Sequence, residues 1–172
     1  MADADILFAA HRDGVFRYLC RIVSPSDARD LTQEVFLRVS RGPVPEADTS
    51  ARRAWVFRIA RNLALNHVRD AGRRGTPTEL IDVARPATQE AAAALREAIQ
   101  RLAPIDRDVF LMREAGGLSY DEIALACEIT ADAVRSRLHR ARQHLREMLG
   151  PILETERASQ PVRLYDKRPK AD

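Results

Sequence analysis

Residues 117–142 read GLSYDEIALACEITADAVRSRLHRAR, and this stretch predicts two helices joined by a tight turn. Ser119 stands three residues before Glu122, which is the spacing of a capping box at the start of a helix. Ala124 is a small residue where two helices would cross closely, and Val134 follows it at the spacing of a helix-turn-helix. The stretch therefore predicts a helix-turn-helix motif.

The second helix of this motif, predicted over residues 130–149, has a narrow apolar stripe and a polar outer face. At 100° per residue, the stripe contains Val134, Leu138, Ala141, Leu145 and Met148. The opposite side presents Asp132, Ser136, His139 and Gln143, with Arg135 and Arg140 on its flanks. Residues 134–146 hold five arginines, two histidines and no acid. Because arginine, serine and glutamine can bond base edges or phosphate oxygens, this face suits the major groove of DNA.

One residue departs from the usual pattern of the motif. Glu128 stands at the turn position that usually holds glycine. A left-handed backbone there would cost glutamate about 1 kcal/mol, so the sequence leaves the turn geometry open. An alternative interpretation is a plain helical hairpin whose basic face is simply solvated.

Helical periodicity covers both halves of the chain without a convincing strand pattern, which predicts an all-α fold of two helical domains. The other predicted helices span residues 5–22, 27–41, 52–71, 88–102 and 105–115. We expect domains over 1–71 and 91–154, joined by a flexible linker, 72–90, that contains Gly75, Pro77 and Pro86. Gly150 and Pro151 should end the last helix, and we expect residues 155–172 to form a polar, loosely ordered tail.

The helix predicted over residues 27–41 has an unusual outer face. Its inner, apolar face contains Ala28, Leu31, Val35 and Val39. Its outer face contains Asp30, Gln33 and Leu37, with Glu34 and Phe36 at the edges. An exposed leucine ringed by acid and amide groups indicates a docking surface. The alternative is an ordinary surface helix with one stray leucine.

The helix predicted over residues 52–71 is apolar on two sides, so we expect it to be buried in a bundle, with Trp55 and Phe57 in the core. Its polar residues share one stripe, formed by Arg58, Asn62 and Arg69, with Asn66 just beyond. Residues 52–74 hold seven arginines and a single acid, Asp70. Arginine can hold phosphate and asparagine can bond a base edge, so this stripe predicts a second nucleic-acid surface.

Composition excludes several classes of protein. The 172 residues are 45% apolar and carry 28 basic and 25 acidic groups, which gives a core-forming chain of net charge +3. No run of about 18 apolar residues is present, which argues against a transmembrane helix, and the N-terminus does not resemble a secretory signal. Cys20 and Cys127 form no CxxC pair, which argues against a disulfide framework or a cysteine zinc site. We therefore expect a cytoplasmic protein. The four histidines show no metal-ligand spacing, and no nucleophile–base pair is visible. We therefore expect no catalytic residues, no metal and no cofactor.

Three stretches together resemble the extracytoplasmic-function (ECF) sigma factors, a family of small bacterial initiation factors. Residues 27–38 resemble region 2.2 of that family, and residues 54–62 resemble regions 2.3 and 2.4. Residues 117–124 and 134–142 resemble region 4.2. The three blocks occur in the family's order, with a linker between the second and the third.

The resemblance implies a role for each predicted surface. Core RNA polymerase would bind, through its β′ clamp helices, to Asp30, Gln33, Glu34 and Leu37. The −10 promoter element would meet Arg58, Asn62, Asn66 and Arg69, and the loop at about residues 42–51 would capture a flipped base. The −35 element would meet Arg135, Ser136, His139 and Arg140.

The implied mechanism uses binding energy, while polymerase supplies the catalysis. Polymerase would hold the two domains apart, because a linker of roughly 20 residues spans about 60–70 Å when extended. The implied partners are core RNA polymerase, including its β flap, promoter DNA and an anti-sigma factor, with no small-molecule substrate. The alternative function is a helix-turn-helix regulator that binds duplex DNA as a dimer.

Overall fold

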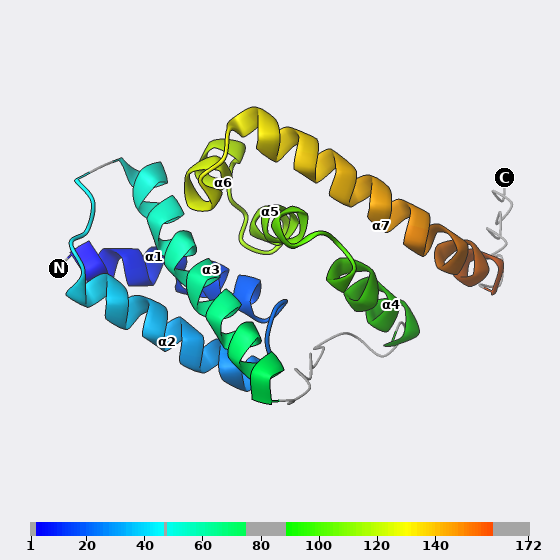
Figure 1. Ribbon diagram of the computed structural model, residues 1–172, viewed down its shortest axis with the longest axis horizontal. Coiled ribbons are helices and arrows are strands. Elements are labelled where there is room, and N and C mark those ends of the chain that lie inside the picture. Colours follow the sequence, from blue (N-terminus) through cyan, green and yellow to red (C-terminus); the bar gives the residue numbers. More distant parts are fainter. Residues whose placement is uncertain (1–2, 47, 75–88, 160–172) are drawn as a thin grey trace, which may run out of the picture.

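The computed structural model describes residues 3–46, 48–74 and 89–159, and every regular element in these ranges is an α-helix (Figure 1). The N-terminal half contains α1 (Asp3–Leu19), α2 (Pro25–Arg41) and α3 (Thr49–Arg74). The C-terminal half contains α4 (Gln89–Gln100), α5 (Pro104–Glu114), α6 (Tyr120–Cys127) and α7 (Ala131–Ser159). The predicted all-α fold is confirmed.

Helices α2 and α3 begin at side chains that satisfy free backbone amides. The Ser24 hydroxyl accepts a hydrogen bond from the Asp27 amide at 3.2 Å and caps α2. The Asp48 carboxylate accepts from the Ala51 amide at 2.7 Å. Because this acid supplies a cap, α3 begins at Thr49 and shortens the loop that the sequence predicted to extend to residue 51.

The last helix is longer than the sequence predicted. Gly150 and Pro151 were expected to end it, but α7 continues to Ser159. A proline removes one backbone donor and bends a helix without having to end it. The predicted tail therefore begins inside α7, and residues 160–172 lie outside the described residues.

The predicted linker is also shorter than expected at both ends. The third helix runs to Arg74, and α4 begins at Gln89. Residues 75–88 lie outside the described residues, so the expectation of a flexible tether falls on a part of the chain that the structure does not describe.

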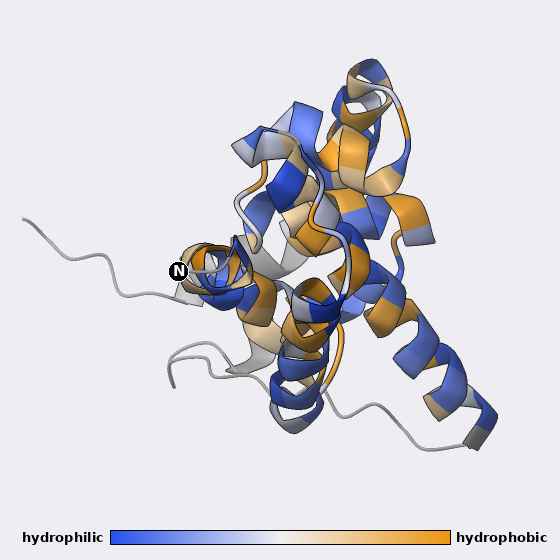
Figure 2. Cartoon of the chain, turned by 90° about the vertical axis from the view of Figure 1, so that its left-hand side faces the viewer, coloured by the Kyte–Doolittle hydropathy of each residue, from blue (hydrophilic) through white to orange (hydrophobic). Residues whose placement is uncertain are grey.

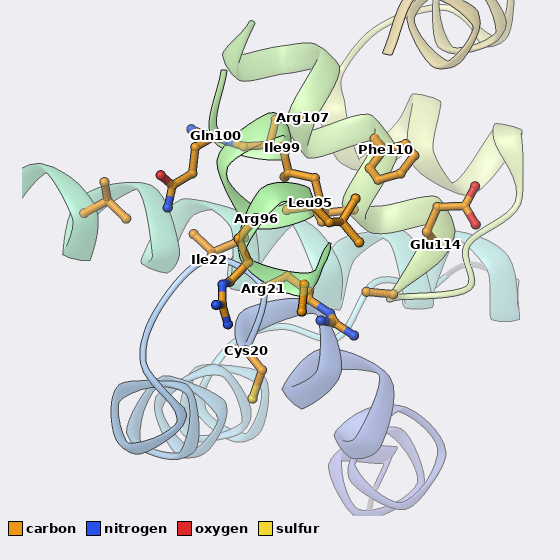
Figure 3. A pocket seen from close by; sticks show the side chains of 14 residues that line it. Cys20, Arg21, Ile22, Leu95, Arg96, Ile99, Gln100, Arg107, Phe110 and Glu114 are labelled. Carbon is orange, nitrogen blue, oxygen red and sulfur yellow. The ribbon is translucent and has the colours of Figure 1, made fainter. Parts of the chain in front are cut away.

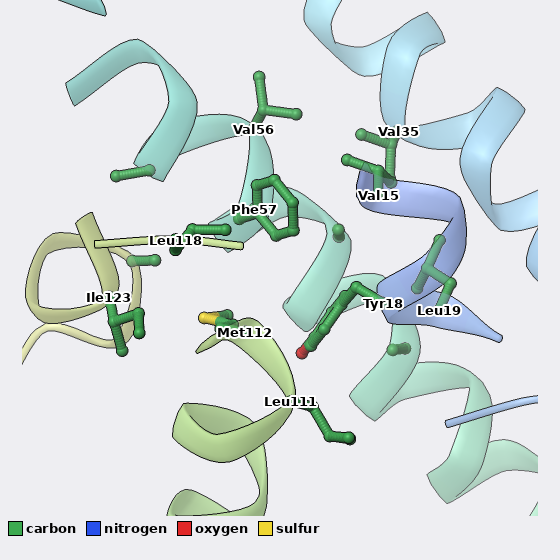
Figure 4. Close-up of a cluster of buried hydrophobic side chains, with 14 of the residues drawn as sticks. Val15, Tyr18, Leu19, Val35, Val56, Phe57, Leu111, Met112, Leu118 and Ile123 are labelled. Carbon is green, nitrogen blue, oxygen red and sulfur yellow. The ribbon is translucent and has the colours of Figure 1, made fainter. Parts of the chain in front are cut away.

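The two halves share one apolar core, which the sequence did not predict. The central helix is α3, which packs against α1 and α2 on one side and against α6 on the other. Figure 4 shows Phe57 of α3 among side chains of both halves, with Tyr18 from α1 and Leu118, Ile123 and Met112 from the C-terminal half. Phe57 and Ile123 have no exposed surface. We call this contact between α3 and the α5–α6 corner the seam.

Individual helices are amphipathic, and their apolar sides turn inward. Figure 2 shows hydrophilic and hydrophobic residues side by side on the same helices. In α7 four residues of the predicted stripe, Val134, Leu138, Ala141 and Leu145, are buried, and the fifth, Met148, is partly buried. The predicted stripe is therefore confirmed, although its last residue stays partly open to solvent. Ala141 and Leu145 pack with Ala98 and Leu102 in a second, smaller cluster. Val68, which lies near the end of α3, is 37% exposed although it is apolar.

Gly116 occupies a position on the seam where no side chain fits. A Cβ atom there would lie 2.7 Å from Cε1 of Phe57 and 2.8 Å from the carbonyl oxygen of Met112. Both distances are shorter than any relaxed carbon contact, and the second involves backbone that cannot rotate away. Glycine at this position therefore allows α3 to approach the α5–α6 loop closely.

We predict that Gly116→Ala lowers the free energy of unfolding by about 1–3 kcal/mol, because the added methyl group overpacks the seam. The matched control is Gly72→Ala, where a Cβ atom would meet nothing within 4 Å. In that control, alanine should leave stability unchanged or raise it by a few tenths of a kcal/mol, up to about 1. Urea unfolding followed by circular dichroism measures both, and equal stability of the two variants would contradict the role of Gly116.

Candidate nucleic-acid interface

The turn between α6 and α7 is built as a helix-turn-helix. The capping box is confirmed, since the Ser119 hydroxyl accepts from the Glu122 amide at 3.2 Å and the Glu122 carboxylate accepts from the Ser119 amide at 2.7 Å. Glu128 ends α6 with φ 58° and ψ 44°, which is the left-handed region. The Ile129 amide then donates to the Ala124 carbonyl at 3.0 Å. The turn geometry that the sequence left open is therefore the usual one, with glutamate in place of glycine.

The predicted −35 residues lie together on the solvent side of α7. Arg135, Ser136, His139 and Arg140 are all exposed. The Arg135 guanidinium bonds the Asp132 carboxylate at 2.6 Å, and both side chains are more than half exposed. Arg140 lies 3.5 Å from the carboxylate of Asp106, which α5 contributes. Because the pair between Arg135 and Asp132 is exposed to solvent, it is weak, and Arg135 can exchange this carboxylate for a DNA group at little cost.

The predicted −10 residues on α3 divide into two groups. Asn62, Asn66 and Arg69 are exposed, and a long hydrogen bond of 3.4 Å joins the last two. Arg58 is half-buried, and its guanidinium bonds the Glu128 carboxylate of the C-terminal half at 3.2 Å. The stripe therefore runs along one side of α3, but its first residue, Arg58, forms an ion pair with the C-terminal half.

The outer face of α2 is open to solvent, as the sequence predicted. Asp30, Gln33 and Leu37 are exposed, and Leu37 retains 46% of its surface. Glu34 is half-buried and bonds Arg38 one turn later at 2.8 Å. These four predicted polymerase-binding residues therefore lie on one accessible side of a single helix.

Sequence reasoning missed the apolar residue, Phe8, that α1 adds beside this face. Phe36 is buried rather than at an open edge, because the ring of Phe8 packs edge-on against it at a centroid distance of 5.0 Å. Phe8 itself is 42% exposed. The signal was present in the run Ile6–Leu7–Phe8, since three consecutive residues of a helix cannot all face the core.

Comparison with known proteins places both halves of the chain. Residues 7–74 match the family described as Sigma-70 region 2, and residues 92–145 match Sigma-70, region 4. The RNA polymerase sigma-H factor of Pseudomonas aeruginosa is 30% identical over 168 residues, which cover 87% of each chain. This protein belongs to the ECF sigma factor family.

Further relatives agree with this assignment. The ECF RNA polymerase sigma factor SigE of Mycolicibacterium smegmatis is 34% identical over 162 residues. That match covers 87% of this chain and 63% of SigE, so this chain spans less than two thirds of the length of SigE. The ECF RNA polymerase sigma-E factor of Escherichia coli is 29% identical over 168 residues, 87% of each chain. The resemblance stated from the sequence is confirmed, and the alternative of a dimeric helix-turn-helix regulator is not favoured.

Two solved structures have the same fold across both halves. The sigma factor RpoE in complex with the anti-sigma factor NepR from Bartonella quintana aligns with a TM-score of 0.66 at 22% identity, over 87% of this chain and 98% of that one. CnrH in complex with the cytosolic domain of CnrY aligns with a TM-score of 0.61 at 23% identity, over 89% and 88% of the two chains.

Charged groups of this sigma factor also meet across the seam. Nε of Arg61 bonds the Asp108 carboxylate at 2.7 Å, and the guanidinium of Arg53 bonds Glu122 at 3.3 Å and the Gly116 carbonyl at 2.9 Å. Burial of Asp108 and Glu122 is nearly complete, with 3% and 6% of their surfaces exposed. Each of these two buried acids therefore has an arginine of α3 as its partner.

A cavity of about 540 Å³ opens beside the seam (Figure 3). The connection after α1 contributes Arg21 and Ile22, while α4 contributes Leu95 and Ile99, and α5 contributes Phe110. The cavity thus lies between the two halves, and its shape depends on their packing.

No helix within the described residues is long and apolar enough to cross a membrane.

Cys127, which is a free thiol at the end of α6, is a natural reporter of this packing. Burial raises its pKa to about 11, from a reference value of 9.0, with Asp108 adding a smaller increase and Arg61 opposing it. Because the thiolate is the reactive form, a rise of about two pKa units leaves roughly 100-fold less of it at pH 8.

We predict that iodoacetamide at pH 8 modifies Cys127 about 100-fold more slowly in the folded Cys20→Ser chain than in urea. Folding raises this pKa, so the proton-bound thiol stabilises the folded state below about pH 9, and stability should fall as the pH rises toward 11. Mass spectrometry of the alkylated chain gives the rates. Equal rates with and without urea would contradict the burial of this thiol.

Proposed function

We propose that this sigma factor binds core RNA polymerase through the outer face of α2 and reads promoter DNA at two places. In this proposal, residues of α3 contact the −10 element and residues of α7 contact the −35 element. The observation that carries the proposal is the outer face of α7, where an acid-poor row of arginine, serine and histidine projects from a fully capped helix-turn-helix.

Polymerase binding is supported by the composition and exposure of α2. Leu37 is a large apolar side chain at the centre of an exposed polar face, next to Asp30 and Gln33. A single exposed apolar anchor surrounded by polar groups is the usual anatomy of a protein interface. The exposed Phe8 of α1, whose ring packs against Phe36 of α2, extends the apolar part of this surface.

The −10 contact is supported by the stripe on α3. Asn62 and Asn66 offer amide groups that can bond base edges, and Arg69 can hold a phosphate. Two modest DNA contacts on one chain raise each other's effective concentration once polymerase holds both halves. Capture of unstacked bases would then favour melting of the promoter.

We also expect a regulatory partner and a cytoplasmic location. One of the two solved structures described above holds the sigma factor RpoE together with the anti-sigma factor NepR, and the other holds CnrH together with the cytosolic domain of CnrY. An anti-sigma factor for this chain would cover surfaces that polymerase or DNA needs. The chain would carry out no catalytic step of its own, because polymerase supplies the chemistry.

The proposal is tested by adding the purified chain to bacterial core RNA polymerase on a library of promoters and sequencing the 5′ ends of the transcripts. Defined start sites preceded by a shared pair of sequence elements would support it. Transcripts identical to those of core enzyme alone would contradict it, and binding of the chain to palindromic duplex DNA as a dimer would favour the alternative regulator.

We predict that Leu37→Asp weakens the affinity for core polymerase about 30-fold or more, because it places a charge at the apolar anchor of the interface. The fold should be unchanged, since Leu37 is exposed. The matched control is Leu125→Asp on α6, where leucine is 54% exposed and lies outside the proposed polymerase face. Fluorescence anisotropy against labelled core enzyme measures both affinities, and similar values for the two variants would remove α2 from the interface.

We predict that Arg135→Ala weakens binding to the preferred −35 sequence by about 1–3 kcal/mol, if the guanidinium bonds one base in a bidentate manner. Arg146→Ala, an exposed position on the same helix outside the proposed contact set, serves as the control. Affinities for holoenzyme are compared on promoters that differ at one −35 position at a time. An equal loss on every sequence would show that Arg135 contacts only phosphate.

A further inference from the structure

The cavity beside the seam has apolar walls that the described residues leave partly open to water. Val68 of α3 and Leu95 of α4 line it, and they keep 37% and 39% of their surfaces exposed. Figure 3 shows Leu95 and Ile99 near Phe110 of α5, with arginine side chains around them. Single exposed apolar residues are common on protein surfaces, but these gather in one hollow, which is typical of a ligand site.

The size and place of the cavity also fit a small molecule. Its volume of about 540 Å³ lies within the range of roughly 300–1,000 Å³ that small-molecule sites occupy. Such sites are common where two domains meet, and they combine apolar walls with a few polar groups that orient the ligand. This cavity lies between the two halves of the chain and contains both kinds of wall.

The polar groups of the cavity carry an excess of positive charge. Among the described residues, its lining includes three arginines, which are Arg21, Arg96 and Arg107, and a single acid, Glu114. The Glu114 carboxylate is already bonded by Arg142 of α7 at 2.9 Å. The side chains of Arg21 and Arg107 make no hydrogen bond or ion pair within the part of the chain that the structure describes. An anion in the cavity would therefore meet two guanidinium groups that have no carboxylate partner there.

We propose that this cavity binds a small amphipathic anion, a molecule with a carboxylate at the end of an apolar chain. The apolar chain lies against Leu95, Ile99 and Phe110, and the positive charges of Arg21 and Arg107 attract the carboxylate. The inference does not depend on the proposed promoter contacts, because none of the residues named for polymerase or DNA lines the cavity.

Such a ligand contacts both halves of the chain at once. The N-terminal half contributes Ile22 and Val68 to the walls, and the C-terminal half contributes Leu95 and Phe110. Because the complete site exists only while the halves are packed together, a bound ligand stabilises that packing by mass action. The temperature of unfolding should therefore rise with ligand concentration.

Cys20 provides a report on whether the cavity is occupied. It is a half-buried free thiol and lines the cavity, so a bound ligand covers it. Cys127 is buried and lies outside the lining, which makes Cys20 the faster of the two thiols to react. The rate at which iodoacetamide modifies Cys20 therefore measures occupancy at this position in the full chain.

The first experiment uses dodecanoate as the probe, below its micellar concentration, and measures its binding to the full chain by calorimetry. We expect one molecule to bind per chain, to raise the temperature of unfolding and to slow the alkylation of Cys20. The matched probe is dodecyltrimethylammonium, which has the same chain and a positive head group. It should bind about tenfold more weakly or less, because the cavity carries the same sign of charge.

The second experiment compares variants of the lining with matched changes elsewhere. Arg21→Gln and Arg107→Gln should each weaken dodecanoate binding about three- to fivefold, since each removes a positive charge at a partly solvated site. Leu95→Ser should weaken binding about fivefold, because it removes apolar contact with the chain. The controls are Arg146→Gln and Leu125→Ser, which make the same changes at exposed positions outside the cavity and should leave binding unchanged.

Three results would each overturn the inference. These are no saturable binding of dodecanoate, equal affinity for the cationic probe, and unchanged alkylation of Cys20 at saturation. Equal losses in the lining variants and their controls would also overturn it, since binding would then lie elsewhere. Arg21 and Leu95 are exposed, so their variants test the site even if Arg107→Gln fails to fold. A chain that binds dodecanoate in this way but directs no transcription would overturn the proposed function alone.

Discussion

The packing of Phe57 against the α5–α6 corner is the contact on which the arrangement of this sigma factor depends. The ring lies at the centre of α3, and its fit requires a glycine at position 116, because any Cβ atom there would overlap it. Helix α3 is thereby shared between two bundles, with α1 and α2 on one side and α6 on the other. Since α3 also carries the proposed −10 stripe, the contact that completes the core also determines how much of that stripe solvent can reach.

The charges at this contact have a different role from the apolar groups. Burial of Asp108 and Glu122 is tolerated because Arg61 and Arg53 neutralise them across the seam. Such pairs add little net stability compared with apolar residues of the same size, but they penalise any other register of the two surfaces. An arrangement held by apolar burial and aligned by ion pairs can open when a larger partner offers better contacts to both halves.

Much of the fold was predictable from local signals. The capping box at Ser119 and the stripe beginning at Val134 each involve residues within a few positions of one another, and the structure confirms both. Helix ends were less predictable, because α7 passes Pro151 and α3 begins at the cap that Asp48 provides. Proline and capping preferences are small energies that a neighbouring turn can outweigh. The site residues on α2 and α7 lie on the exposed faces that periodicity assigned to them.

The amino-acid sequence by itself determined the family, the all-α class and the faces of individual helices, because helical periodicity and capping act over a few residues. Only the tertiary structure decided that the two halves share a core, that Arg58 faces Glu128 and that Phe8 covers Phe36. These contacts join residues up to 70 positions apart. No periodic pattern records such a pairing, since it depends on how whole helices cross and on which small residue, here Gly116, lets them approach.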